Sequence, residues 1–365
     1  MKILMIGAKK FPNSREGGID IVVERLAVFM SQMGHDVTVL VRKRKGVEKF
    51  REFNGIKVVS IFTINKKSLD ALVYSFFATR YAQRHHFDVV HFHAEGNTFF
   101  INKTKKLNSK IITTIHGIDW KRGKFKGLGK KILLKSEKRL AKYSDKIITL
   151  CENDAKYFKD TYNIDSFLIP NGVESNIHFL DGNLITKQFD IIPKKYILFL
   201  ARIVPEKGLH YLIKAFKNIA KTNFQLVIAG GSSHSSLYYN EMVELAGNAS
   251  NIIFTGFVSG DILSELFSNA FLYVLPSDIE GMPLSLIEAL SYKNICLCSN
   301  IDELTGIKSS NCYFFKHGDV ADLQIKLTEI MDNPPRFKEE EIFLPWSRIA
   351  EKTINVYEGF IKTNR

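Results

Sequence analysis

Two patterns of apolar and polar positions alternate along the chain. Short apolar runs, such as Lys2–Ile6 and Tyr196–Ala201, are typical of buried strands. Longer stretches with apolar residues three and four positions apart, such as Leu284–Ser291, favour helices. Because strands that alternate with helices form parallel sheets covered on both faces, the alternation predicts an α/β fold. The other candidate strands are Asp36–Val41, Lys57–Ile61, Val89–Phe92, Lys110–Thr114, Lys146–Leu150, Ser166–Ile169, Gln225–Gly230, Ile252–Thr255, Phe271–Leu275 and Ile295–Ser299. The other candidate helices are Ile21–Met33, Leu69–His85, Gly129–Tyr143, Leu209–Thr222, Leu237–Gly247, Ile262–Ser268 and Ala321–Asp332.

The alternating pattern occurs twice, on either side of residues 175–193. We therefore expect two doubly wound domains, over residues 1–180 and 181–345, and a last helix over residues 346–365. In doubly wound sheets, ligands bind in the crevice at the carboxyl ends of the strands. Residues that follow the strands are therefore the first candidates for a functional site.

Charge is unevenly distributed between the two halves. Residues 1–180 hold 33 of the 51 Lys and Arg residues and 17 of the 38 Asp and Glu residues, which gives this half a net charge of +16. The remaining residues carry a net charge of −3. This asymmetry predicts an anionic partner for the first half alone. Because no nucleic-acid motif accompanies it, we expect an anionic membrane face or a lipid-pyrophosphate acceptor, and no nucleic acid.

Composition also bears on where the protein works. The sequence has no apolar run of about 18 residues that would predict a transmembrane helix. The N-terminus has a strand pattern without the length of a signal peptide, and the four cysteines lack metal-binding spacing, which fits a reducing cytoplasm. We therefore expect a cytoplasmic protein, peripheral on the inner face of the cell membrane.

The segment Pro276–Leu290 carries the strongest functional signal. A turn-prone run follows an apolar strand and precedes a helical pattern, so Glu280 falls in the loop and Glu288 about one and a half turns into the helix. Backbone N–H groups in the range Gly281–Leu284 would point at an anion at the helix N-terminus. Carboxylates on either side of a phosphate site suit a nucleotide-sugar. Two solvated glutamates are the plain alternative, but they do not account for the Gly-x-Pro loop.

A second loop carries two cations. Arg202 and Lys207 follow the strand Tyr196–Ala201 and precede a helix. Two cations at the crevice suit the charges of a pyrophosphate. Because no Asp-x-Asp triplet occurs in the sequence, we expect no metal clamp. The two cations and the helix N–H groups would then meet the charge on a leaving diphosphate.

The first domain has weaker signals. Gly17 and Gly18 precede a helix, where they form either a simple turn or a loop that lets backbone approach a ligand. His116 follows a strand and either opens onto the crevice or only caps the strand end. His91 and His93 alternate on one strand without a third ligand, so we expect a structural or acceptor-facing role rather than zinc.

Residues 120–135 interleave basic and large apolar side chains. Such a segment either docks at an anionic lipid interface or forms a solvated helix face. The sequence leaves both interpretations open.

The segment from Glu280 to Glu288 resembles the Glu-x7-Glu signature of the retaining, GT-B-fold glycosyltransferases of family 4. The loop Ala201–Leu209 is similar to the Arg-x4-Lys-Gly segment of that family, and the resemblance spans nearly all of the chain. It implies a GT-B fold, with two Rossmann-like domains facing a central cleft and the last helix crossing back onto the first domain. The first domain would bind the acceptor and the second the nucleotide-sugar.

The resemblance also implies an activity. A sugar would move, with retention of its anomeric configuration, from a nucleotide-diphosphate sugar to a saccharide or lipid-linked acceptor in cell-surface polysaccharide, O-antigen or glycolipid biosynthesis. It implies no metal and no cofactor apart from the donor substrate. Catalytic roles would fall on His116 and Glu280. Donor contacts would come from Gly17, Gly18, Arg202, Lys207, Gly281, Met282, Pro283, Leu284 and Glu288.

Other enzyme classes share parts of this pattern. A hydrolysing nucleotide-sugar epimerase has the same fold class and releases free nucleotide without any acceptor, and it remains the main alternative. A nicotinamide oxidoreductase needs a glycine fingerprint and an acidic ribose ligand that the first domain lacks. A glycosidase needs two carboxylates across one bond, whereas Glu288 is placed for a nucleotide.

Overall fold

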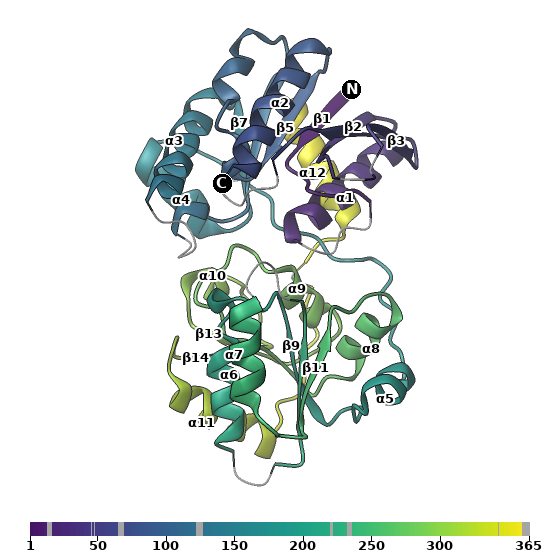
Figure 1. Cartoon of the computed structure of the whole chain (residues 1–365), viewed down its shortest axis with the longest axis vertical. Coiled ribbons are helices and arrows are strands. Elements are labelled where there is room, and N and C mark those ends of the chain that lie inside the picture. Colours follow the sequence, from purple (N-terminus) through teal and green to yellow (C-terminus); the bar gives the residue numbers. More distant parts are fainter. Residues whose placement is uncertain are drawn as a thin grey trace. The chain divides into compact units, whose positions relative to one another are not determined.

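The structure, a computed structural model, divides into two compact units (Figure 1). Unit 1 comprises Met1–Gly172 and Leu344–Arg365, and unit 2 comprises Val173–Phe343. The chain therefore passes from unit 1 to unit 2 after Gly172, before the boundary expected at residue 180, and residues 173–180 belong to unit 2. The described residues are 1–12, 17–44, 46, 48–64, 69–121, 127–219, 222–231, 236–341 and 343–359.

Unit 1 is built on a sheet with the strand order β3-β4-β2-β1-β5-β6-β7-β8. The order reverses beside β1, because β1 pairs in parallel with both β2 and β5. This doubly wound arrangement confirms the alternation predicted from the sequence and puts the switch point at the carboxyl ends of β1 and β5. The strands are β1 (Lys2–Ile6), β2 (Asp36–Arg42), β3 (Phe50–Phe53), β4 (Ile56–Ile61), β5 (Val89–His93), β6 (Lys110–Ile115), β7 (Lys146–Thr149) and β8 (Phe167–Leu168). The α-helices are α1 (Gly18–Gln32), α2 (Asp70–Arg84), α3 (Leu128–Tyr143), α4 (Glu152–Tyr162) and α12 (Trp346–Glu358), with 3-10 helices η1 (Glu95–Asn97), η2 (Ile101–Lys106) and η3 (Asp119–Lys121).

Strand β3 departs from the parallel sheet predicted by the sequence. It runs antiparallel to β4, and Asn54 and Gly55 connect the two strands. Both connecting residues have positive φ angles, 48° and 77°, as a type I′ hairpin turn requires. The expectation of purely parallel sheets is therefore wrong at this edge.

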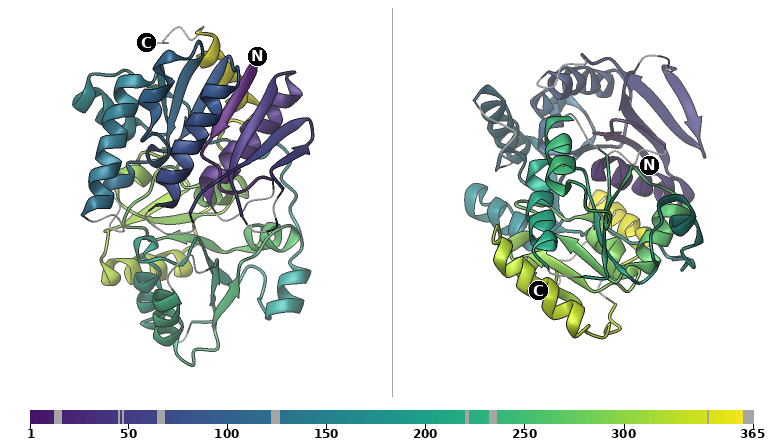
Figure 2. Two further views of the ribbon diagram at one scale, coloured as in Figure 1. Left: turned by 45° about the horizontal axis from the view of Figure 1, so that its top comes forward. Right: turned by 60° about the horizontal axis from the view of Figure 1, so that its bottom comes forward.

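The last helix, α12, belongs to unit 1 and packs on α1, as Figures 1 and 2 show in yellow and purple. Trp346 and Tyr357 of this helix are buried. The hydroxyl of Tyr357 lies 2.6 Å from Nδ1 of His91 on β5, so the helix is hydrogen-bonded to the sheet. The sequence predicted this helix over residues 346–365, of which residues 360–365 lie outside the described part of the chain.

Unit 2 has a second doubly wound sheet, with the strand order β11-β10-β9-β12-β13-β14. Its strand pairs are parallel, and the order reverses beside β9. Strand β14 and helices α5 and α10 were not predicted from the sequence. The strands are β9 (Tyr196–Leu200), β10 (Gln225–Ala229), β11 (Ile252–Gly256), β12 (Leu272–Leu275), β13 (Cys296–Ser299) and β14 (Cys312–Phe315). The helices are α5 (Asn183–Phe189), η4 (Pro205–Lys207), α6 (Leu209–Lys217), α7 (Ser236–Ala246), α8 (Asp261–Asn269), α9 (Leu284–Ser291), α10 (Asp302–Thr305) and α11 (Val320–Asp332).

Both faces of the unit 2 sheet are buried. Along β12, Leu272 and Val274 belong to one hydrophobic core, and Tyr273 and Leu275 belong to the other. Helices α6, α7 and α11 complete the first core, and α5, α8 and α9 complete the second. Figure 1 shows α6 and α7 on one side of the strands and α5 and α8 on the other. The covered faces leave the loops at the carboxyl ends of β9 and β12 as the place for a ligand.

Candidate active site

Two loops of unit 2 meet at the carboxyl ends of β9 and β12. Gly208, in the first loop, has a φ of 67°, and a Cβ there would lie 1.8 Å from the carbonyl oxygen of Pro276 in the second loop. The backbone N–H of Asp278 also donates to the carbonyl oxygen of Glu206, at 3.0 Å. Any side chain at position 208 would force the loops apart. The glycine of the Arg-x4-Lys-Gly segment is explained by this close approach.

Lys207 and Glu280 form an ion pair across the two loops. Nζ of Lys207 donates to Oε1 of Glu280 at 2.5 Å, and Oγ of Ser277 donates to the same oxygen at 2.7 Å. The side chains of Lys207 and Glu280 are only 15% and 6% exposed. The sequence assigned the two residues to separate motifs, and the structure brings them into direct contact. Because the pair is shielded from water, removing one partner would leave the other charge uncompensated.

Arg202 lies in the loop that follows β9 and is half-buried. The loop after β10 packs closely against it, since a Cβ at Gly230 would lie 1.9 Å from the carbonyl oxygen of Ala201. The N–H of Ile203 donates to the carbonyl oxygen of Gly231 at 3.2 Å. The loops after β9, β10 and β12 therefore form one continuous edge, which carries both predicted cations.

Helix α9 begins at Leu284, directly after Pro283, as the sequence predicted. Its first N–H groups lie at a helix end, where they lack acceptors within the helix and can bind an anion. Gly281 is buried and Met282 half-buried in the segment that leads into this turn. Glu288 is half-buried in the second turn of α9. The predicted donor contacts of the C-terminal half therefore lie in the loops after β9 and β12 and in the first two turns of α9.

Two contacts of these loops were not predicted. The buried hydroxyl of Tyr273 lies 2.8 Å from Oγ of Ser285, which ties β12 to the first turn of α9. Oδ1 of Asp278 lies 2.7 Å from Nε2 of His317. In the sequence, Tyr273 is one of several residues in an apolar run, and His317 carries no motif. Only the folded chain shows that both support the loops.

Three histidines line the carboxyl ends of β5 and β6 in unit 1. Nδ1 of His93 lies 3.2 Å from Nε2 of His116, which is half-buried after β6. His91 is hydrogen-bonded on both sides, through Nδ1 to Tyr357 at 2.6 Å and through Nε2 to Thr114 at 2.7 Å. His91 therefore has the structural role that the sequence favoured over zinc.

Burial sets the charge state of these histidines. It lowers the pKa of His91 to about 3 and that of His93 well below 6.5, and the neighbouring imidazoles lower both further. Both rings are therefore neutral at pH 7. His116 has a neutral, hydrogen-bonding neighbour rather than a competing charge.

The predicted glycine loop lies at the start of α1. Gly17 has an extended backbone with a φ of −163°, which any residue can adopt, and a Cβ there would meet nothing nearer than Asp20 at 3.9 Å. Gly18 is exposed as the first residue of the helix. Neither strain nor crowding explains the glycine at position 17, and the open space beside it is compatible with a ligand loop. Residues 13–16 of this loop lie outside the described residues.

The basic segment over residues 120–135 is described only in part, because residues 122–126 are outside the described ranges. Nζ of Lys130 lies 4.9 Å from the ring centroid of Trp120, and Leu128 is exposed at the start of α3. A cation on an aromatic ring fits a lipid interface and a solvated surface equally. No helix in the described part of the chain combines the length and the apolar character that a bilayer crossing needs.

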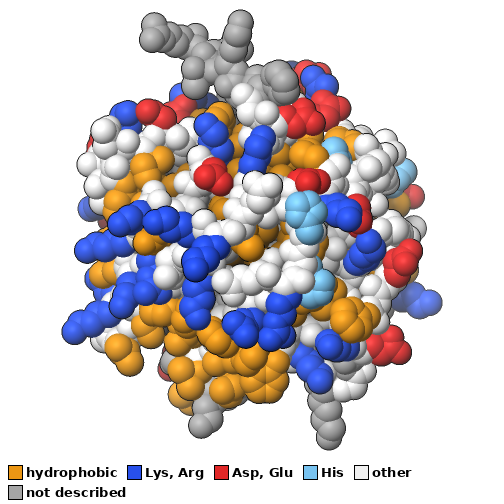
Figure 3. All heavy atoms as spheres, turned by 90° about the horizontal axis from the view of Figure 1, so that it is seen from above, with side chains coloured by type: hydrophobic (Ala, Val, Ile, Leu, Met, Phe, Trp, Pro, Cys, Tyr) orange, Lys and Arg blue, Asp and Glu red, His pale blue; other side chains and the backbone are white. Residues whose placement is uncertain are grey.

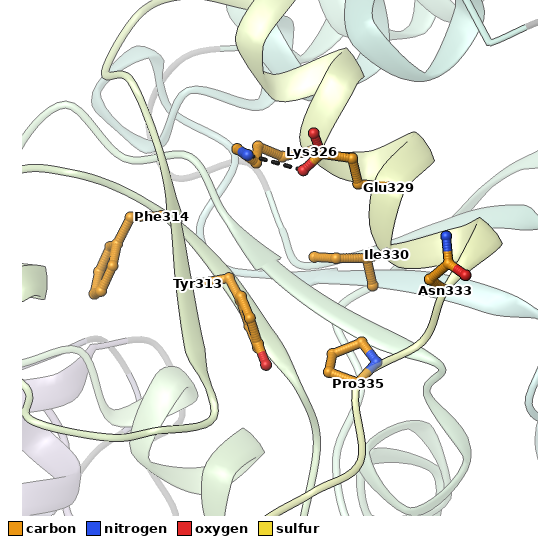
Figure 4. Close-up of a pocket in the computed structure, with 7 residues that line it drawn as sticks. All are labelled: Tyr313, Phe314, Lys326, Glu329, Ile330, Asn333 and Pro335. Carbon is orange, nitrogen blue, oxygen red and sulfur yellow. Dashed lines mark hydrogen bonds and ion pairs between the residues drawn. The ribbon is translucent and has the colours of Figure 1, made fainter.

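A cavity of about 380 Å³ lies elsewhere in unit 2, between β14 and the end of α11 (Figure 4). The ion pair of Lys326 and Glu329 lies on its wall, with 2.8 Å between Nζ and Oε2. None of the predicted site residues lines it. It is lined by Tyr313, Phe314, Lys326, Glu329, Ile330, Asn333 and Pro335.

Both halves of the chain match glycosyltransferase families. Residues 16–176 match the family model described as Glycosyltransferase Family 4, and residues 185–342 match the one described as Glycosyl transferases group 1. An uncharacterized glycosyltransferase from Methanocaldococcus jannaschii is 25% identical and is matched over 98% of both chains.

Solved structures show the fold. A sucrose-phosphate synthase from Thermosynechococcus elongatus has a TM-score of 0.85 at 18% identity, over 98% of both chains. HepE from Anabaena, solved with UDP and glucose, has a TM-score of 0.77 at 14% identity, over 99% of this chain and 100% of its own. The chain is a glycosyltransferase of the GT-B fold. In this GT-B glycosyltransferase, the segment from Glu280 to Glu288 lies within the group 1 match.

Proposed function

We propose that this GT-B glycosyltransferase moves a sugar from a nucleotide-diphosphate sugar to a saccharide or lipid-linked acceptor, with retention of configuration and without a metal. The observation that carries the proposal is the ion pair of Lys207 and Glu280 beside the first turn of α9. A diphosphate at this edge would meet a lysine, Arg202 and helix N–H groups together. Few other ligands need so much positive potential beside two carboxylates.

The donor would bind by exchanging partners with the ion pair. When the diphosphate arrives, Lys207 gains a second anionic partner, and the oxygens of Glu280 become acceptors for hydroxyl groups of the sugar. Glu288 would accept hydrogen bonds from the ribose. The UDP bound by HepE, which has the same fold, supports this class of donor.

The bond changes follow from this placement. The acceptor hydroxyl attacks the anomeric carbon on the face that the diphosphate leaves, and an oxygen of the departing phosphate takes the acceptor's proton. Arg202 and Lys207 stabilise the charge that develops on the diphosphate, which is the usual role of a metal in such reactions. We propose that His116 contacts the transferred sugar and that Gly17 and Gly18 let the backbone approach a ligand closely.

A phenylalanine surface on unit 1 supports a lipid-linked acceptor at an anionic membrane. Phe62 is 54% exposed and Phe77 40% exposed, and their ring centroids lie 5.4 Å apart. From Phe77 the edge-to-face contacts continue through Phe76 and Phe100, with centroids 5.2 Å apart at each step. The phenylalanine surface comprises Phe62, Phe76, Phe77, Phe99 and Phe100.

Cations accompany the phenylalanine surface. Nζ of Lys103 lies 4.6 Å from the ring centroid of Phe76, and the guanidinium of Arg139 lies 4.5 Å from that of Phe99. Figure 3 shows hydrophobic side chains gathered along one margin of its view, with Lys and Arg side chains beside them. Aromatic rings bordered by cations suit the headgroup region of an anionic bilayer. We propose that this surface brings the enzyme to the inner membrane face, for cell-surface polysaccharide, O-antigen or glycolipid synthesis.

A donor screen tests the proposal and its main alternative. Thermal unfolding with a panel of nucleotide-diphosphate sugars should give a higher Tm with the true donor, because ligand that binds the folded state stabilises it. That donor should then be consumed only when an acceptor is present, and EDTA should not stop the reaction. Rapid acceptor-independent release of nucleotide and an epimerised sugar would identify a hydrolysing epimerase instead.

A further inference from the structure

Two carboxyl groups meet in the interior of unit 1. Glu95 is the first residue of η1, directly after β5, and Glu137 lies on α3, and both side chains are fully buried. Ala94, just before Glu95, has a φ of 67°, a strained conformation for a residue other than glycine. Buried carboxyl groups destabilise a protein unless they are hydrogen-bonded. We refer to Glu95 and Glu137 as the acid pair.

Glu137 is the member of the acid pair that accepts hydrogen bonds from several donors. Its Oε2 accepts a hydrogen bond from Nε1 of Trp120 at 2.8 Å. Its Oε1 accepts from the hydroxyls of Tyr157 at 2.8 Å and Tyr162 at 2.5 Å. Burial, together with the hydrogen bond to Glu137, raises the pKa of Tyr157 to about 12 and also raises that of Tyr162, so both remain donors. Three donors around one carboxyl group favour the form that only accepts hydrogen bonds, the carboxylate.

Glu95 is the protonated member. Its Oε2 accepts from the N–H of Asp119 at 3.2 Å, but Oε1 has no donor among the described residues. Burial raises the pKa of Glu95 well above 4.5, and the charges of Asp119 and Glu137 raise it further. A carboxylic acid at Oε1 can donate to Glu137, which gives both groups a partner. One proton held between the two carboxyl groups would satisfy both.

Both members of the acid pair hold the loop that follows His116. Asp119 is bound through its backbone and Trp120 through its indole. Nε2 of His116, at the start of the loop, lies 3.2 Å from His93, which ends β5 just before the acid pair begins. We propose that the acid pair shares one proton, fixes residues 116–120 and thereby positions His116 for sugar transfer. This inference rests on the proposed role of His116, and Glu95 and Glu137 are positioning residues that do not touch substrate.

A rise in pH acts on the acid pair by removing the proton of Glu95. The neighbouring histidine of β5 is already neutral at pH 7, so a rise in pH acts on the proton of Glu95 rather than on that ring. Loss of that proton would leave two carboxylates in contact. The titratable and charged groups that face the acid pair and its donors are Asp119 and Lys121 of η3, Lys130 of α3, Tyr157 and Tyr162 of α4, and His93 and His116.

The direction of the pH effect follows from linkage. The folded state retains a proton on Glu95 that the unfolded state gives up at its ordinary, lower pKa. Folding stability therefore decreases as the pH rises from the unfolded pKa towards the raised folded pKa, and the loop loses order as the pH passes through the folded pKa.

Glutamine substitutions separate the two members. Glu95→Gln keeps a neutral donor, so it reproduces the protonated state and should remove the alkaline loss of kcat. Glu137→Gln removes the carboxylate that three donors need, so it should lower kcat at least about tenfold at every pH, with a smaller effect on KM. Glu52→Gln, at an exposed position on β3, is the matched control and should retain the pH profile of the unmodified enzyme.

The fluorescence of Trp120 gives a readout that needs no activity. The chain has two tryptophans, and Trp346→Phe leaves Trp120 as the single emitter. In that background, emission should change as the pH rises through the raised pKa of Glu95, and Glu95→Gln should abolish the change. The inference is overturned if the change persists in Glu95→Gln, or if both glutamine variants behave alike. If Glu95→Gln abolishes the change but no variant transfers sugar, the acid pair holds the loop and the proposed function fails instead.

Discussion

Nζ of Lys207 lies 2.5 Å from Oε1 of Glu280, although the two residues are 73 positions apart and belong to different loops. Gly208 makes the contact possible, because its missing side chain lets the two loops touch. The protein thus holds a cation and a carboxylate together at the carboxyl ends of β9 and β12. In our account, this pair is the centre of the donor site.

Lys207→Met should destabilise unit 2 by about 3–5 kcal/mol, because it leaves the carboxylate of Glu280 buried without its cation. The double variant Lys207→Met with Glu280→Met should recover most of that loss, since no charge is then left unpaired. Urea unfolding at pH 7 measures both. The exposed pair of Lys159 and Asp165 provides the control, and Lys159→Met should cost at most about 1 kcal/mol. Equal losses in the single and double variants would show that the pair is not the reason for the destabilisation.

Glu288→Ala should weaken the binding of the bare nucleoside diphosphate by about 1–3 kcal/mol, because the ribose hydroxyls lose their acceptor. Isothermal titration calorimetry measures the change directly. Glu244→Ala, at an exposed position on α7, should leave the affinity unchanged. An unchanged affinity in Glu288→Ala would remove Glu288 from the donor site.

Arg202→Ala should depress kcat more than it weakens donor binding, because the diphosphate gains charge only as it leaves. His116→Ala should lower kcat at least about tenfold, roughly 1.4 kcal/mol of transition-state stabilisation. Steady-state kinetics give kcat for each variant, and donor Kd values show how far each substitution weakens donor binding. Turnover that survives within a few-fold in Arg202→Ala, or an enzyme that EDTA inactivates, would contradict metal-free stabilisation of the diphosphate.

Phe62→Ser combined with Phe77→Ser should reduce binding to anionic liposomes while leaving nucleotide binding intact. The physical reason is the loss of exposed aromatic area, and binding by the unmodified protein should also weaken as salt rises. Leu237→Ser is the control, because Leu237 is 76% exposed but lies in unit 2. Neutralising Lys124, Lys126, Lys130 and Lys131 tests the basic segment separately. Sedimentation with vesicles that shows no binding at low salt would rule out the membrane surface.

Most of the fold could be predicted from the sequence, because a buried parallel strand is an apolar run that can be recognised without knowing which strands lie beside it. The edges of the sheets were harder to predict. The hairpin of β3 depends on Asn54 and Gly55, whose dipeptide is itself a turn signal that the apolar pattern does not include. Strand β14 is short, and α5 begins in the stretch that the sequence assigned to the domain connection.

The site was predictable residue by residue but not as a set of contacts. The loops of Lys207 and Glu280 each carry local motifs, so both positions could be found, whereas their ion pair depends on the approach of Gly208 to Pro276. Glu95 had no local signal, because a single glutamate after a strand looks like a solvated loop residue. Its role appears only when the chain folds and α3 brings a second carboxyl group beside it.

Retention of configuration is tested by the stereochemistry of the product. Proton NMR of the first product formed from the donor chosen by thermal shift would show the configuration at the anomeric carbon. Our account predicts that the product keeps the configuration of the donor, that it forms only with an acceptor present, and that it forms equally in EDTA. An inverted anomeric carbon, or free sugar released without an acceptor, would contradict the proposed retaining transfer.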